Sequence, residues 1–231
     1  MLLDLIQGGD MLTIFMGLCV SAFVVFCILP IHECAHAFVA TKLGDNTARL
    51  SGRLTLNPLA HISPWGAVMI LLVGFGYAKP VPVNVRNTKL KNKKLAMALI
   101  ALAGPLSNLL VAFLSSLLQF LVVAISIDKT GDFSVAATAL YTFFKYSAII
   151  NVNLAVFNLI PIPPLDGSRI LFAILPSKLY FGVMKYERYI MAAMFLLLLT
   201  GLLTKPLSIL TSLICNGFDK LFYSIYLMII G

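Results

Sequence analysis

Residues 11–36 read MLTIFMGLCVSAFVVFCILPIHECAH, so a long apolar run leads directly into the ionisable side chains of His32, Glu33 and His36. Residues four apart share one face of an α-helix, so the two histidines can hold one metal ion together. Glu33 then lies beside the metal, where a carboxylate can activate water. Ionisable side chains at membrane depth are costly and usually functional. The stretch therefore predicts a membrane helix that carries a metal site.

The composition predicts an integral membrane protein. Hydrophobic residues make up 60% of the 231 residues and charged residues only 11%, far from the balance of a soluble domain. We expect a single integral membrane domain over 1–231, with an all-α polytopic fold of about five or six transmembrane segments. The apolar runs lie at about 11–40, 65–78, 95–127, 135–160, 189–203 and 206–230.

The positive charges predict the orientation in the membrane. If the short run 65–78 dips into the membrane and returns, most of the 17 basic residues fall on one side, which the positive-inside rule assigns to the cytoplasm. The net charge of +8 then reflects contact with anionic headgroups of the bilayer and not with nucleic acid. Asp219 and Lys220 interrupt the run 206–230, which either spans the membrane or lies at its interface. The densest basic loop contains Lys79, Arg86, Lys89, Lys91, Lys93 and Lys94.

Two stretches between the first and second long spans alternate between apolar and polar residues. Residues 48–58 place Leu50, Leu54 and Leu56 on one side, and residues 80–86 alternate in the same way. A period of two predicts strands, so we expect a small re-entrant or interfacial β-element here. Its edge at Leu54, Thr55 and Leu56 could pair with an extended substrate, or the sheet could simply pack the core.

A catalytic zinc keeps three protein ligands, so a third ligand is expected. Asp166 is the leading candidate, because the three prolines of Asn158–Gly167 free the backbone at the end of an apolar run. The alternative role of Asp166 is an N-cap of a helix over 168–175. His61 is the rival ligand, although a substrate contact or the anchoring of its own loop explains it as well.

Three motifs in order resemble the site-2 protease family, which consists of intramembrane zinc proteases. They are HExxH at 32–36, AGPLSN at 103–108, and Asn158 followed by PPLDG at 163–167. Further similarity, in 52–61 and 78–84, is to the compact prokaryotic subgroup that lacks PDZ and CBS domains. The resemblance implies one Zn²⁺ per chain, held by His32, His36 and Asp166, with Glu33 as general base. It also implies roles near the substrate for Asn108 and, through its motif, for Asn158.

These features predict that the chain is a zinc-dependent endopeptidase and a multi-pass protein of the cell membrane. It would cut a transmembrane segment of single-span membrane-protein substrates within the bilayer, with its active site toward the cytoplasm. The alternatives are a divalent-metal transporter and a catalytically silent membrane binding protein of the same fold. A pair of packing histidines with an ion-paired Glu33 is disfavoured, since the nearest basic residue, Lys42, lies more than two turns away. The sequence leaves the oligomeric state open.

Overall fold

The computed structural model describes residues 11–66, 68, 79–126 and 134–230. Its first helical stretch runs without a break through α2 (Met11–Phe23), the π-helical turn η1 (Val24–Ile28) and α3 (Leu29–Lys42). The wider π turn comes just before Pro30, whose ring cannot continue the hydrogen bonding of a regular α-helix. The HExxH residues therefore lie on α3, within a helix that is apolar over most of its length.

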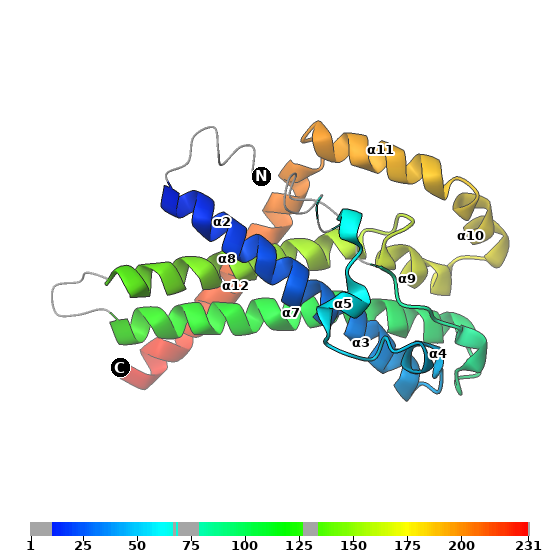
Figure 1. Ribbon diagram of the computed structural model, residues 1–231, viewed down its shortest axis with the longest axis horizontal. Helices are drawn as coiled ribbons and strands as arrows, with labels where there is room; N and C mark the ends of the chain where they lie inside the picture. The colour runs from blue at the N-terminus through cyan, green and yellow to red at the C-terminus, as the bar shows by residue number, and fades with distance from the viewer. Residues whose placement is uncertain (1–10, 67, 69–78, 127–133, 231) are drawn as a thin grey trace.

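Two long helices, α7 (Lys93–Ser126) and α8 (Val135–Leu159), run side by side along the long axis of the molecule (Figure 1). Small residues let them approach closely, and a hydrogen bond of 2.9 Å joins the hydroxyls of Ser115 and Ser147 across the contact. Several small side chains of α3 and α7, which pack against each other, are also buried, namely Ala40, Ala96, Ala101 and Ala103.

Three helices in the described part of the chain are long and apolar enough to cross a membrane: Gly17–Lys42, Lys93–Ser126 and Val135–Leu159. They confirm the prediction of an all-helical protein with membrane-spanning helices. The helix α11 (Glu187–Leu199) has 13 residues, so it is only about 20 Å long, short of the roughly 30 Å hydrocarbon core. The count of five or six spans therefore stays a prediction.

Helices from the C-terminal part of the chain pack against the α7–α8 pair. Helices α9 (Asp166–Ile174) and α10 (Ser177–Met184) follow the proline-rich turn, and α12 (Thr204–Ile230) crosses behind the pair (Figure 1). Aromatic side chains fix α12 in place, because Phe222 contacts both Phe113 and Phe120 of α7. The two long helices are thus covered by α3 and α12.

The prediction of a β-strand over 48–58 is wrong. Residues Thr47–Leu50 form the short helix α4, which begins where Asp45 accepts a hydrogen bond from the backbone N–H of Thr47. Gly52 then reverses the chain in the left-handed region, with φ of +68°. The alternation does not mark a buried face, since Leu50 and Leu56 are exposed and Arg53 is buried. Leu54, Thr55 and Leu56 therefore offer no strand edge.

The remaining short elements between α3 and α7 are the helix α5 (Pro58–His61) and the 3-10 turn η2 (Val85–Asn87). Residues 80–84, the other predicted strand, have no strand partner in the described part of the chain. Two prolines there remove the N–H groups that a ladder would need. Most of the predicted re-entrant stretch 65–78 lies outside the described residues.

Candidate metal centre

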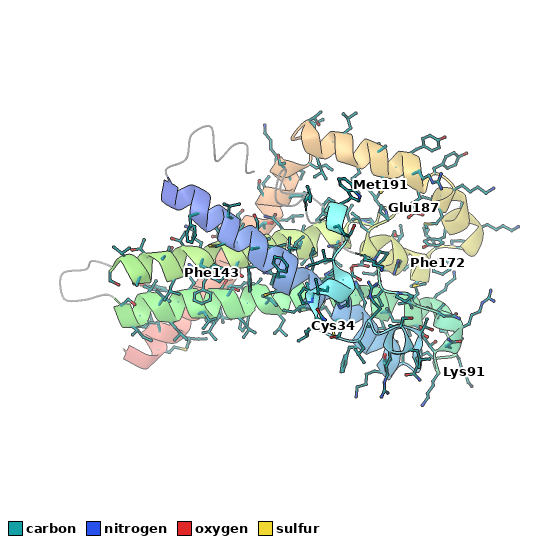
Figure 2. The ribbon with its side chains drawn as sticks, in the orientation of Figure 1. Cys34, Lys91, Phe143, Phe172, Glu187 and Met191 are labelled. Carbon is teal, nitrogen blue, oxygen red and sulfur yellow. The ribbon has the colours of Figure 1, made fainter. Side chains whose placement is uncertain are left out.

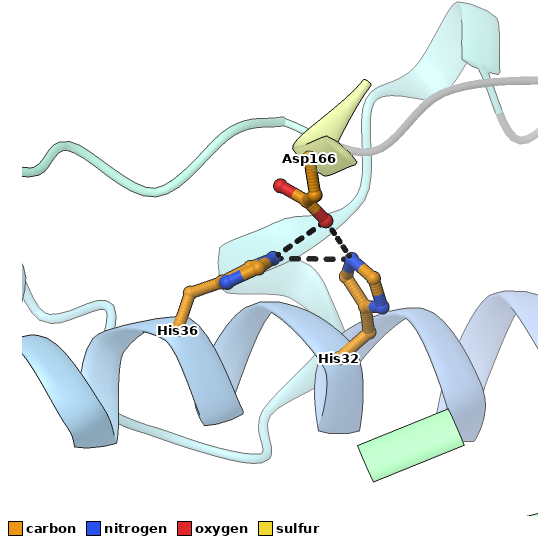
Figure 3. Close-up of side chains that lie close together, drawn as sticks. All are labelled: His32, His36 and Asp166. Carbon is orange, nitrogen blue, oxygen red and sulfur yellow. Dashed lines mark hydrogen bonds and ion pairs between the residues drawn. The ribbon is translucent and has the colours of Figure 1, made fainter. Parts of the chain in front are cut away.

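Three side chains from two distant segments converge beside α7 (Figure 3). The Nε2 atoms of His32 and His36 lie 3.1 Å apart. Each is 3.2 Å from Oδ2 of Asp166. The three residues are between 6% and 9% exposed, so one ion placed between them would be nearly shielded from solvent.

The spacing and chemistry of these atoms fit a zinc ion. Ligand atoms about 2.0–2.1 Å from zinc at tetrahedral angles are about 3.3 Å from one another, close to the separations of 3.1 and 3.2 Å found here. Two imidazoles and one carboxylate also form the three-ligand set that leaves a fourth position for water. The donor set therefore suits a catalytic site better than a closed structural one.

A backbone carbonyl of α7 fixes the orientation and the tautomer of the His36 ring. Its Nδ1 lies 2.7 Å from the carbonyl oxygen of Ile100. Because a carbonyl can only accept, Nδ1 must carry the proton, which leaves the Nε2 lone pair for a metal ion. Nδ1 of His32 is buried and has no hydrogen-bond partner among the described residues.

Gly104 of α7 provides the room in which the two imidazoles lie. A Cβ built on this glycine would be 2.5 Å from Cε1 and 2.6 Å from Nε2 of His32, and closer still to His36. Real Cβ atoms essentially never come within 3.0 Å of such atoms. The absence of a side chain at Gly104 is therefore a requirement of the site.

Asp166 enters the site from the first turn of α9. The N-cap of that helix is Leu165, so the alternative role of Asp166 as the N-cap is wrong. Gly167 packs against the carbonyls of Leu159 and Ile160, so closely that a Cβ there would overlap them. This contact folds the turn back on the end of α8. Burial alone would raise the pKa of Asp166, but the hydrogen bonds and charges of His32 and His36 hold that pKa well below its usual range.

Glu33 follows His32 on α3 and bonds to a different segment. Its Oε2 accepts a hydrogen bond of 3.1 Å from the backbone N–H of Val81. The carboxylate is partly exposed and therefore accessible beside the buried ligand group.

The other predicted site residues differ in their surroundings. Asn108 is buried one turn after Gly104 on α7, and its Oδ1 has no partner among the described residues. His61 is buried and anchors its loop, because its Nε2 lies 2.8 Å from the carbonyl oxygen of Thr55. It is not part of the ligand group that the described residues form. Asn158 donates to the carbonyl of Leu154 in its own helix.

Sequence reasoning missed three contributors to this site. Gly104 and the carbonyl of Ile100 lie next to a recognised motif, but only packing reveals that they shape and orient the histidines. The hydrogen bond from the N–H of Val81 to Glu33 was missed because residues 80–86 were predicted to form a strand. The only available signal was the alternation of Pro80 and Pro82 around it.

The sequence is similar to known peptidases over most of its length. Residues 20–201 match the family model described as Peptidase family M50. "Putative zinc metalloprotease YwhC" of Bacillus subtilis is 44% identical over 158 residues, which cover 68% of this chain and 70% of that protein. "Putative zinc metalloprotease Rip2" of Mycolicibacterium smegmatis is 30% identical over 145 residues, or 60% of this chain and 51% of that protein. No solved structure shows a significant match. The chain therefore belongs to peptidase family M50, the site-2 protease family.

Proposed function

We propose that this protein is a zinc-dependent endopeptidase that cuts a transmembrane segment of membrane-protein substrates within the bilayer. The observation that carries the proposal is the buried group of His32, His36 and Asp166, whose ligand atoms are 3.1–3.2 Å apart. Its two histidines lie on a helix that can span a membrane. Glu33 supplies the adjacent carboxylate that hydrolysis requires.

The reaction needs one ion and one base. Zinc, when bound, acts as a Lewis acid that makes water easier to deprotonate and polarises the scissile carbonyl. Glu33 takes a proton from the attacking water while the oxygen of that water bonds to the carbonyl carbon of the substrate. The same carboxyl group then gives that proton to the leaving amine as the C–N bond breaks. His32, His36 and Asp166 would hold the ion, one per chain.

Asn108 is our candidate for a substrate contact. It lies on the face of α7 that carries Gly104, and its side chain amide could donate to the oxygen that becomes negative. Its buried Oδ1 has no partner among the described residues, and because this oxygen can only accept, it supports a further contact with a backbone N–H of the substrate. For Asn158, whose amide is bonded within its own helix, and for His61, which anchors a loop, direct roles have less support.

The depth of the site supports cleavage inside the membrane near its cytoplasmic face. His36 lies six residues, or about 9 Å along the helix axis, before Lys42 at the end of the span. Figure 2 shows Lys91 at the end of the molecule that also carries α4, away from Phe143 on the apolar α8. Positive charge marks the cytoplasmic side. We therefore propose that the site lies in the cell membrane toward the cytoplasmic side. The protein would act as one membrane domain, and its substrate would be a single-span membrane protein.

Cleavage of a model single-span substrate in liposomes tests the proposal. We expect wild-type protein to cut it and a zinc chelator to stop the reaction. Glu33→Gln keeps the metal ligands and removes the base, so it should retain zinc and lose at least 100-fold in rate. Glu187→Gln is the matched control, because Glu187 is the only other glutamate and lies at the start of α11 (Figure 2).

The alternatives give different results. A divalent-metal transporter would move zinc across the liposome membrane and cut nothing. A silent binding protein would bind zinc and substrate without cleavage. Cleavage by Glu33→Gln at the wild-type rate would refute Glu33 as the base.

A further inference from the structure

The segment Lys79–Val83 offers one backbone donor between two prolines. Pro80 and Pro82 have no N–H, so the N–H of Val81 is the only one that the three residues 80–82 carry. That N–H donates to Oε2 of Glu33 at 3.1 Å, across 48 positions of the chain. Residues 80–82 thus direct their one backbone donor at the candidate base.

The side chain of Val81 meets the same face of α3. It is 7% exposed and belongs to the buried cluster with Ala37 and Ala48. Ala37 follows Glu33 by four residues and therefore shares its helix face. Val81 is consequently placed by its packing as well as by its hydrogen bond.

Both ends of the segment are fixed by further hydrogen bonds. The N–H of Lys79 donates to the carbonyl of His61 at 2.7 Å, and the carbonyl of Lys79 accepts from the guanidinium of Arg53. On the other side, the N–H of Asn84 donates to Oδ2 of Asp45 at 2.6 Å. His61, Arg53 and Asp45 are all buried. The donor that Glu33 meets is therefore pre-positioned.

We propose that the backbone N–H of Val81 positions the carboxylate of Glu33 for proton transfer, which makes Val81 a positioning residue of the peptidase. This inference rests on the function proposed above. A glutamate side chain has three rotatable bonds, and bonding Oε2 to a fixed donor removes most of that freedom. Oε1, which bonds to no other described residue, is left to accept the proton from water.

Val81→Pro tests the inference because it deletes the N–H and keeps an apolar side chain. Val83→Pro is the matched control: it puts a proline in the same segment, at a residue whose N–H bonds to no described partner. Val81→Ala keeps the N–H and loses part of the packing. We would measure kcat, KM and zinc content for each variant with the model substrate in liposomes.

We expect Val81→Pro to lower kcat about 10- to 100-fold, as for loss of a hydrogen bond to a charged group, with KM and zinc content close to wild type. Val81→Ala should keep a kcat at least tenfold above that of Val81→Pro, and Val83→Pro should keep the wild-type kcat. A kcat for Val81→Pro equal to that of Val83→Pro overturns the inference while cleavage by wild type upholds the proposed function. A faster Val81→Pro also overturns it, because the segment would then restrain Glu33 and not position it.

Thermal unfolding gives a second readout that does not depend on activity. Val81→Pro should lower the unfolding temperature more in the Glu33 protein than in the Glu33→Ala variant, since only the former has the bond to lose. Equal changes in unfolding temperature with and without Glu33 would mean that Val81 and Glu33 do not interact, which overturns the inference. Failure of wild type to cut any single-span substrate, with zinc bound, defeats the proposed function and the positioning role of Val81 together.

Discussion

Gly104→Ala should abolish tight zinc binding although alanine favours the helix. Its Cβ would lie 2.6 Å from Nε2 of His32, where ordinary contacts begin near 3.4 Å, so the imidazole must retreat by about 0.8 Å. Zinc–ligand distances tolerate only about 0.2 Å. The retreat therefore removes a ligand from its position, and we expect zinc affinity to fall at least 100-fold, or about 2.8 kcal/mol.

Gly217→Ala is the control for this substitution. Gly217 also lies inside a long helix, α12, but a Cβ there meets nothing within 4 Å. Alanine at that position should raise the unfolding free energy by about 0.5–1 kcal/mol through helix propensity and leave zinc binding alone.

Competition with a chromophoric chelator in detergent measures zinc affinity for both variants, and circular dichroism checks that they keep their helices. Gly104→Ala with the affinity of wild type would refute the argument, since it would mean that α7 and α3 can separate without disturbing the ligands. Equal losses in both variants would point to a general effect of alanine.

Three other outcomes are expected. Asp166→Asn should reduce bound zinc below one ion per chain by mass spectrometry, because the amide is a weaker ligand than the carboxylate, whereas Asp219→Asn should not. Asp45→Ala should lower the unfolding free energy by about 1–3 kcal/mol in thermal unfolding, since it removes the acceptor of the Thr47 and Asn84 N–H groups. Burial raises the pKa of Asp45, but the hydrogen bonds from the Thr47 hydroxyl and from the N–H groups of Asn84 and Thr47 outweigh that effect and leave the pKa below its ordinary value. The stability that Asp45 contributes is therefore complete at neutral pH and lost as the pH falls below about 4, a loss that unfolding scans from pH 7 to pH 3 would detect and that should be missing in Asp45→Ala.

Periodicity and motifs predicted the parts of the molecule that local chemistry determines. The apolar runs became α7 and α8, and spacing of four placed His32 and His36 on one helix face. The placement of Asp166 beside them followed from a motif, because the sequence carries no direct information on which turns meet.

Tertiary contacts decided the parts that sequence reasoning got wrong or missed. Residues 48–58 alternate like a strand, yet the bonds of Asp45 and the reversal at Gly52 favour a helical turn. The role of Gly104 depends on the rings of another helix, and that of Val81 on a carboxylate 48 positions away. Neither relation has a local signature.

The convergence of His32 and His36 with Asp166 also has a consequence for biosynthesis. About 130 residues separate the second histidine from the aspartate, so a ribosome adding 5–20 residues per second needs roughly 6 to 26 seconds to pass from one to the other. During that interval the nascent chain contains His32, Glu33 and His36 but not yet Asp166. Under the function proposed above, the chain would therefore gain its peptidase activity only after its fourth apolar run, 135–160, has been made.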